Sequence, residues 1–85
     1  MKSGLIVYLV GGGELPEDFD LGSHCKEMGF PADRVELVSS RQGFLEVEDA
    51  WHYLFTRGYG HIKLLVAQAG PNCLQPLQPP VRLSG

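Results

Sequence analysis

The feature that most constrains the fold is a continuous apolar run near the start of the chain. It spans Leu5 to Val10 and ends at three successive glycines, Gly11-Gly12-Gly13. No polar residue interrupts the run, so a strand formed by it would need cover on both faces. A run that is rich in β-branched residues is typical of a buried parallel strand, and it predicts the α/β class.

The size of the chain allows one domain and leaves that domain short of stability. The chain has 85 residues, of which 44% are hydrophobic and 20% charged, as in ordinary globular proteins. A domain this small buries only about 60% of the surface of its unfolded chain. A disulfide, a metal or a partner could supply the missing stability.

The charge balance argues against a nucleic-acid partner. The formal net charge is -3, the isoelectric point is about 5.4, and the seven Lys and Arg residues are scattered without a run. Nucleic-acid binding needs a clustered basic surface. Apolar runs are also too short for a membrane span or a signal peptide, so we expect a cytoplasmic protein with no membrane partner.

Two helices are predicted, and the first is expected to start at Pro16-Glu17-Asp18. Proline in a first turn and acids near the positive end of the helix dipole are typical of such a start. Leu21, Cys25 and Met28 then form one apolar stripe. Gly29, Phe30 and Pro31 suit a left-handed residue, a hydrophobic contact and a stop, so this helix should end near Met28.

The second helix has the clearest periodicity in the chain. Its apolar stripe comprises Val47, Ala50, Trp51, Leu54 and Phe55. We expect this stripe, including Trp51, to be buried. Acidic residues occupy its first turn and Arg57 is placed in its last, both favourable to the helix dipole. Gly58 and Gly60 end it.

The remaining segments predict two more strands and a tail. Arg34 to Val38 partly alternates polar and apolar residues, which suits an edge strand, and Ile62 to Ala67 forms a third strand. Four prolines then occur in ten residues from Pro71 onward. We therefore divide the chain into a small α/β domain, residues 1–70, and a proline-rich tail or linker, residues 71–85.

The order β-α-β-α-β predicts a three-stranded parallel sheet with right-handed crossovers. If the helices cover both faces, the strand order is 2-1-3, which is half of a doubly wound fold. Ligands of such sheets bind at the carboxyl ends of the strands. The candidate binding rim comprises Gly11, Gly12, Gly13, Ser39, Ser40, Gln68, Asn72 and Cys73.

Several chemistries lack their motifs. The glycine run matches neither G-x-G-x-x-G nor a Walker loop, and the acids that follow it would repel a nucleotide. Ser39 and Ser40 have no G-x-S-x-G elbow, and no neighbouring base activates Cys73. Zinc-ligand spacing is missing among His24, Cys25, His52, His61 and Cys73. We assign no catalytic residue, metal or cofactor, and we expect both cysteines to be free thiols.

Two stretches resemble a known family: "LIVYLVGGG" and "RVELVSSRQGFLEVEDAWHYLFTRGYGHIKLLVAQAGPNC". The chain resembles, over residues 5–73, the delta subunit of methyl-viologen-reducing hydrogenases, also fused to heterodisulfide reductases. The resemblance implies that the family's cluster cysteines correspond to the glycine turn, to Ser39 or Ser40, to Gln68 and to Cys73. An iron–sulfur cluster needs about four thiolates, and only Cys73 supplies one, so the resemblance implies a relative without a cluster.

These observations predict a non-catalytic accessory or protein-interaction domain. A three-stranded sheet has two free edges and two helices shield it poorly, so we expect a homodimer or another protein partner. The alternative is a small-ligand-binding domain that uses the rim, with the glycine turn and Asn72 as polar contacts. A third reading is thiol chemistry at Cys73.

The missing cysteines generate a first prediction. Protein purified without oxygen should contain no stoichiometric iron and show no visible absorbance of an iron–sulfur cluster, because one thiolate cannot hold a cluster. Elemental analysis and an absorption spectrum measure this directly. One iron or more per chain would contradict the prediction and the idea of a relative that has lost its cluster.

Overall fold

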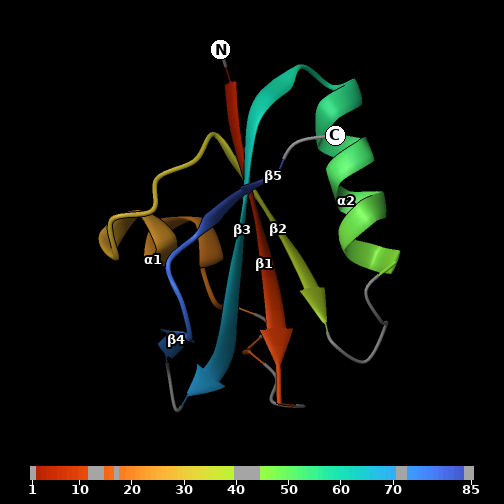
Figure 1. The fold of residues 1–85 in the computed structure, drawn as a ribbon. Helices are drawn as coiled ribbons and strands as arrows, with labels where there is room; N and C mark the ends of the chain where they lie inside the picture. Colours follow the sequence, from red (N-terminus) through yellow and green to blue (C-terminus); the bar gives the residue numbers. More distant parts are fainter. Residues whose placement is uncertain (1, 12–14, 17, 40–44, 71–72, 84–85) are drawn as a thin grey trace.

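A computed structural model of the protein describes residues 2–11, 15–16, 18–39, 45–70 and 73–83, with the backbone alone at positions 45 and 73. These residues form a mixed five-stranded sheet with a helix on each face (Figure 1). No helix among them is both long and apolar enough to cross a membrane. The elements are β1 (Lys2–Val10), α1 (Leu21–Glu27), β2 (Arg34–Ser39), α2 (Leu45–Thr56), β3 (Tyr59–Gly70), β4 (Cys73–Pro76) and β5 (Val81–Leu83).

The apolar run lies inside the sheet, as its sequence predicts. β1 pairs in parallel with β2 on one side and with β3 on the other, so the order 2-1-3 of the three parallel strands is confirmed. Leu5 lies opposite Val35 of β2 and Lys63 of β3, and the same register continues to Leu9. β2 lies at the edge of the sheet, again as predicted.

The two faces of β1 carry two separate hydrophobic cores. Leu5, Val7 and Leu9 are buried on the α1 side with Cys25, whereas Ile6 is buried on the α2 side with Leu54. This division follows from the strand repeat, in which successive side chains point to opposite faces. The predicted placement of one helix on each face is therefore confirmed.

The start of α1 differs from the prediction. The helix begins at Leu21, and its N-cap is Asp20, whose carboxylate accepts hydrogen bonds from the Ser23 backbone N–H (3.1 Å) and hydroxyl (2.8 Å). Both bonds lower the pKa of Asp20, and the bond from the hydroxyl has the larger effect. Pro16 is instead the first residue of a turn, and its carbonyl accepts a hydrogen bond from the Phe19 N–H. An aspartate can satisfy a free N–H of the first helical turn, which a proline cannot do.

The end of α1 is as predicted. Gly29 adopts a positive φ of 91°, and its N–H donates to the Lys26 carbonyl (3.1 Å). The Phe30 N–H donates to the Cys25 carbonyl (2.8 Å), which completes a Schellman motif. The helix thus ends at the C-cap Met28.

The stripe of α2 is only partly buried, contrary to the prediction. Val47 and Leu54 are buried, but Trp51 is half-buried and Phe55 is 56% exposed. The two rings stack on each other, with centroids 4.9 Å apart. Phe55 is one residue past Leu54 and so lies about 100° further around the helix, away from the sheet. Arg57 also lies just beyond the helix, which ends at Thr56, and not in its last turn.

The sheet has five strands, not the predicted three. β4 pairs antiparallel with residues 67–70 of β3, and β5 pairs antiparallel with residues 62–64. The sheet therefore extends beyond residue 70, into the segment for which the sequence predicts a tail or linker. Proline is tolerated there because the outer side of an edge strand needs no donor.

Leu74 attaches this proline-rich segment to the rest of the molecule. Its side chain is 3% exposed in the α1-side core, and its N–H donates to Nε2 of His24 on α1 (3.3 Å). Further along, the Leu77 N–H donates to the Val66 carbonyl (2.9 Å). Burial and hydrogen bonding together order a segment whose composition alone is typical of a linker.

Packing at Leu54 generates a stability prediction. This side chain is fully buried and lies against Gly4 of β1, where an added Cβ would come within 2.9 Å of its Cδ1. Leu54→Ala should lower the free energy of unfolding by about 2–5 kcal/mol, because the cavity beneath α2 cannot fill. Chemical denaturation followed by circular dichroism measures the change.

The matched control is the neighbouring exposed residue. Phe55→Ala should cost much less than Leu54→Ala, because Phe55 is largely exposed. Equal losses in the two variants would show that α2 packs on the sheet with a different face.

Candidate functional site

The predicted binding rim forms in part. Ser39 of β2 lies opposite Leu9, and Gln68 of β3 lies opposite Val10. Gly11 follows β1 directly with a φ of 85°, is exposed, and has open space where a side chain would be. The structure therefore brings these three predicted residues to one end of the sheet.

The other predicted rim residues cannot be placed in this way. Gly12, Gly13, Ser40 and Asn72 lie outside the described residues, and Cys73 is described only by its backbone, which pairs with Gly70. The side-chain amide of Gln68 donates to Oε1 of Gln75 on β4 (2.8 Å), so it links β3 to β4. Ligand binding at the rim stays a prediction.

The candidate metal ligands are separated. Cys25 is buried in the α1-side core, where loss of hydration raises the pKa of its thiol. His24 accepts the backbone hydrogen bond from β4, and His52 lies 3.9 Å from Glu48 on the exposed side of α2. Among the residues that the structure describes, no group of three His, Cys, Asp or Glu residues is arranged to hold a metal ion.

The two edges of the sheet differ in how they are protected. The β3 side is covered by β4 and β5, and these strands are interrupted between Pro76 and Val81 by a segment that contains Pro79 and Pro80. Interrupted, proline-rich edges resist pairing with a further strand. The β2 edge is six residues long without interruption, contains no proline, and has no neighbouring strand on its outer side within the described chain.

The α1-side face of β2 carries an exposed apolar side chain. Val35 packs against the α1-side core, but Leu37, two residues on and on the same face, is 46% exposed. Among the side chains that the structure describes, four other large hydrophobic residues are comparably exposed, but none of them is on this edge: Tyr53, Phe55, Leu77 and Val81. From Arg34 to Val38, the β2 edge therefore combines a backbone that no described strand pairs on its outer side with a partly uncovered leucine.

The α2-side face of β2 carries a pair of opposite charges. Nε of Arg34 donates to Oε1 of Glu36 at 2.6 Å. This hydrogen bond and, to a smaller extent, the negative charge of Glu36 raise the pKa of Arg34. Arg34 also reaches the hydroxyl of Tyr53 on α2 (3.4 Å), and Arg57 stacks on the same ring at 3.6 Å from its centroid. Packing against α2 thus holds Arg34 and Glu36 side by side on the edge.

Sequence reasoning recognised β2 as an edge strand but missed these residues. The signal was present: Arg34 and Glu36 are two residues apart, which places them on one face of a strand. Their importance depends on which of the two sheet edges remains free, and only the pairing of β4 and β5 decides that.

No protein-family model, curated protein or solved structure matches this chain. The resemblance to hydrogenase delta subunits therefore stays a prediction, and so does the loss of the cluster. A function can therefore be inferred only from the residues on the surface of this chain.

The environment of Cys25 generates a prediction about its reactivity. Under native conditions Cys25 should react with iodoacetamide far more slowly than a thiol in an unfolded peptide, because it is buried and its raised pKa disfavours the reactive thiolate. Mass spectrometry of the peptides that contain Cys25 and Cys73 follows the two thiols separately. Protein unfolded in urea is the control and should react at the peptide rate; rapid native labelling of Cys25 would contradict its burial.

Proposed function

We propose that this chain is a non-catalytic protein-interaction domain whose β2 edge pairs with the β2 edge of a second copy. The supporting observation is the self-complementary charge pattern of that edge: Arg34 and Glu36 lie on one face of a strand that pairs with β1 on one side and with no described strand on the other. An edge strand leaves backbone donors and acceptors unpaired, and an added strand satisfies them. The proposed dimer is a continuous sheet formed from two chains.

The charges favour one register for this pairing. In an antiparallel arrangement about Val35, Arg34 of each copy lies opposite Glu36 of the other, and the two-fold axis makes both contacts equivalent. Opposite charges in such cross-strand pairs stabilise a sheet, and like charges destabilise it. Pairing about Glu36 would instead oppose two carboxylates.

The same register also covers apolar surface. It sets Val35 against Val35 of the second copy and places Leu37 diagonally beside it, within reach of a long side chain. Leu37 would then lose part of its 46% exposure. Burial of this apolar surface in a dimer should add to the stability of the domain, because a chain this small buries little surface by itself.

The resemblance noted in the sequence is compatible with this role. A relative of a hydrogenase subunit that lacks the cluster cysteines cannot carry electrons through a cluster and can contribute only its surfaces. An accessory domain that docks through a sheet edge is such a contribution. This proposal does not depend on the kinship, because it rests on the β2 edge of this chain.

Measurement of mass in solution tests the proposed dimer. Sedimentation or light scattering should give twice the 9.3 kDa chain mass for the natural sequence. Leu37→Lys should yield a monomer, because it puts two cations in the interface. Leu77→Lys is the control. Leu77 is 51% exposed and lies beside β3, away from the β2 edge, so this variant should remain a dimer.

A charge exchange tests the register. Arg34→Glu should dissociate the dimer, because each edge would then oppose carboxylate to carboxylate. The double variant Arg34→Glu, Glu36→Arg should restore it, because the exchanged pattern is again self-complementary. A natural chain that is monomeric at every concentration, or an Arg34→Glu variant that stays dimeric, would contradict the proposed interface.

A further inference from the structure

A hollow of about 320 Å³ lies at the end of the sheet opposite the predicted rim. Its base is the amino-terminal part of β1 and β3, and its walls are the loop that follows α1 and the chain just before β5. A volume of this size suits a small organic molecule. The residues that line it and enter the argument are Ser3, Leu5, Phe30, His61, Lys63 and Pro80.

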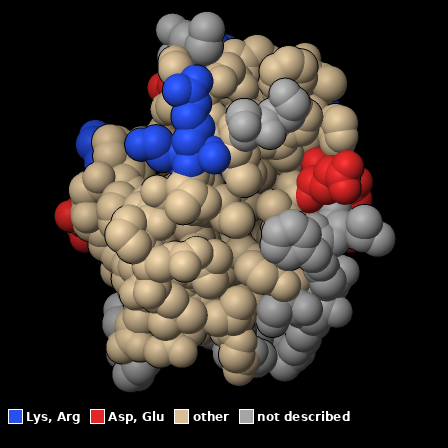
Figure 2. Space-filling model, viewed as in Figure 1, with Lys and Arg blue, Asp and Glu red and all other residues tan. Residues whose placement is uncertain are grey.

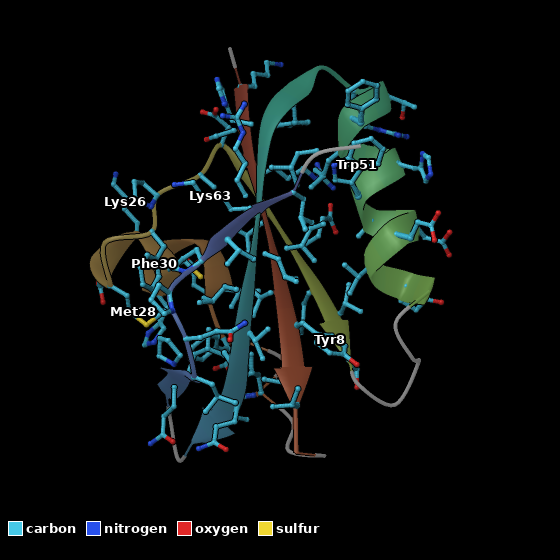
Figure 3. All side chains as sticks on the ribbon, in the orientation of Figure 1. Tyr8, Lys26, Met28, Phe30, Trp51 and Lys63 are labelled. Carbon is cyan, nitrogen blue, oxygen red and sulfur yellow. The ribbon has the colours of Figure 1, made fainter. Side chains whose placement is uncertain are left out.

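Part of the lining is apolar and held in place by the fold. Leu5 is buried in the α1-side core, and Phe30 packs against that core. The Schellman hydrogen bond to Cys25 fixes the backbone of Phe30, and its ring packs against the core, so this wall is positioned before any ligand arrives. Figure 3 shows Phe30 beside α1 and Lys63 on β3, on the same side of the sheet.

The rim of the hollow is basic. Lys63 lines it, and Arg82 of β5 lies directly opposite Lys63 in the antiparallel ladder. Residues in such a pair place their side chains next to each other on one face of the sheet. His61, two residues before Lys63, lies on the same face. Figure 2 shows Lys and Arg atoms gathered where Figure 3 labels Lys63, well apart from the largest visible group of Asp and Glu atoms.

These two cations have no counter-ion from the described chain. Neither the side chain of Lys63 nor that of Arg82 forms a hydrogen bond or ion pair with any residue that the structure describes. Asp33 lies close to the hollow, but its carboxylate accepts from the backbone N–H (2.7 Å) and hydroxyl (3.3 Å) of Ser3. Two like charges opposite each other destabilise a sheet unless an anion joins them.

We infer that the hollow binds a phosphate monoester with a small apolar body. The phosphate carries a charge of about -1.5 to -2 at neutral pH, which matches the two cations of Lys63 and Arg82. A guanidinium offers it two parallel hydrogen bonds and an ammonium a point charge. The apolar body enters the hollow and contacts Leu5, Phe30 and Pro80.

Phenyl phosphate is the probe that tests this inference. Titration of the labelled protein, followed by NMR, should shift the amide signals of Gly4, Ala32 and Lys63 and saturate. Benzoate lacks the second charge and inorganic phosphate lacks the apolar body, so each should bind about tenfold more weakly or worse. Added salt should weaken the binding of phenyl phosphate, because both cations are exposed.

Three variants and two controls locate the site. Lys63→Gln and Arg82→Gln should each weaken phenyl phosphate binding about tenfold, and Ala32→Phe should block it by filling the hollow while both cations remain. Arg57→Gln removes a cation that stacks on Tyr53, away from the hollow, and should leave binding unchanged. Arg34→Glu should also bind normally, because the hollow does not depend on the proposed dimer.

Each other outcome would overturn the inference. If benzoate bound as tightly as phenyl phosphate, the second negative charge would contribute nothing to binding. If inorganic phosphate bound as tightly, the apolar wall would contribute nothing. Shifts confined to Gly11 and Gln68 would move the site to the predicted rim. No saturable shift at millimolar phenyl phosphate, with circular dichroism showing a folded protein, would leave the hollow without this ligand class.

Discussion

The structure depends on the burial of β1 on both faces. Leu5, Val7 and Leu9 face one core and Ile6 faces the other, so β1 is stable only between two helices and two neighbouring strands. The approach of α2 is close because Gly4 leaves room for Leu54. Burial of apolar surface is the main source of stability in a chain this small, and every other element is arranged around it.

The proline-rich segment decides which surfaces remain. By pairing with β3 it covers one edge of the sheet, and β2 is then an uninterrupted edge strand with no described strand on its outer side. The same segment brings Arg82 opposite Lys63 and Pro80 against the hollow. The proposed dimer edge and the proposed anion site therefore both follow from the position of one short segment, although they use different residues.

Local signals predicted local features well. The end of α1 needed only Gly29 with a positive φ and Phe30 beyond it, and both act within five residues of the helix end. The start was misplaced because Pro16 and Asp20 are both plausible helix starts, and the hydrogen bonds of Asp20 to Ser23 select the second. Phe55 was assigned to the core because a helical repeat gives spacing, but it does not give the width of the sheet that the helix covers.

The sequence by itself determined the α/β class, the order of the three parallel strands and the division of β1 between two faces. These features follow from apolar runs and short connections, whose consequences are local or nearly so. Only the tertiary structure decided that residues 73–76 and 81–83 join the sheet, where Leu74 is buried in a core and its N–H donates to His24, 50 residues away. Contacts between residues so far apart leave no periodic trace in the sequence, so the free edge and the basic hollow could be recognised only in the folded chain.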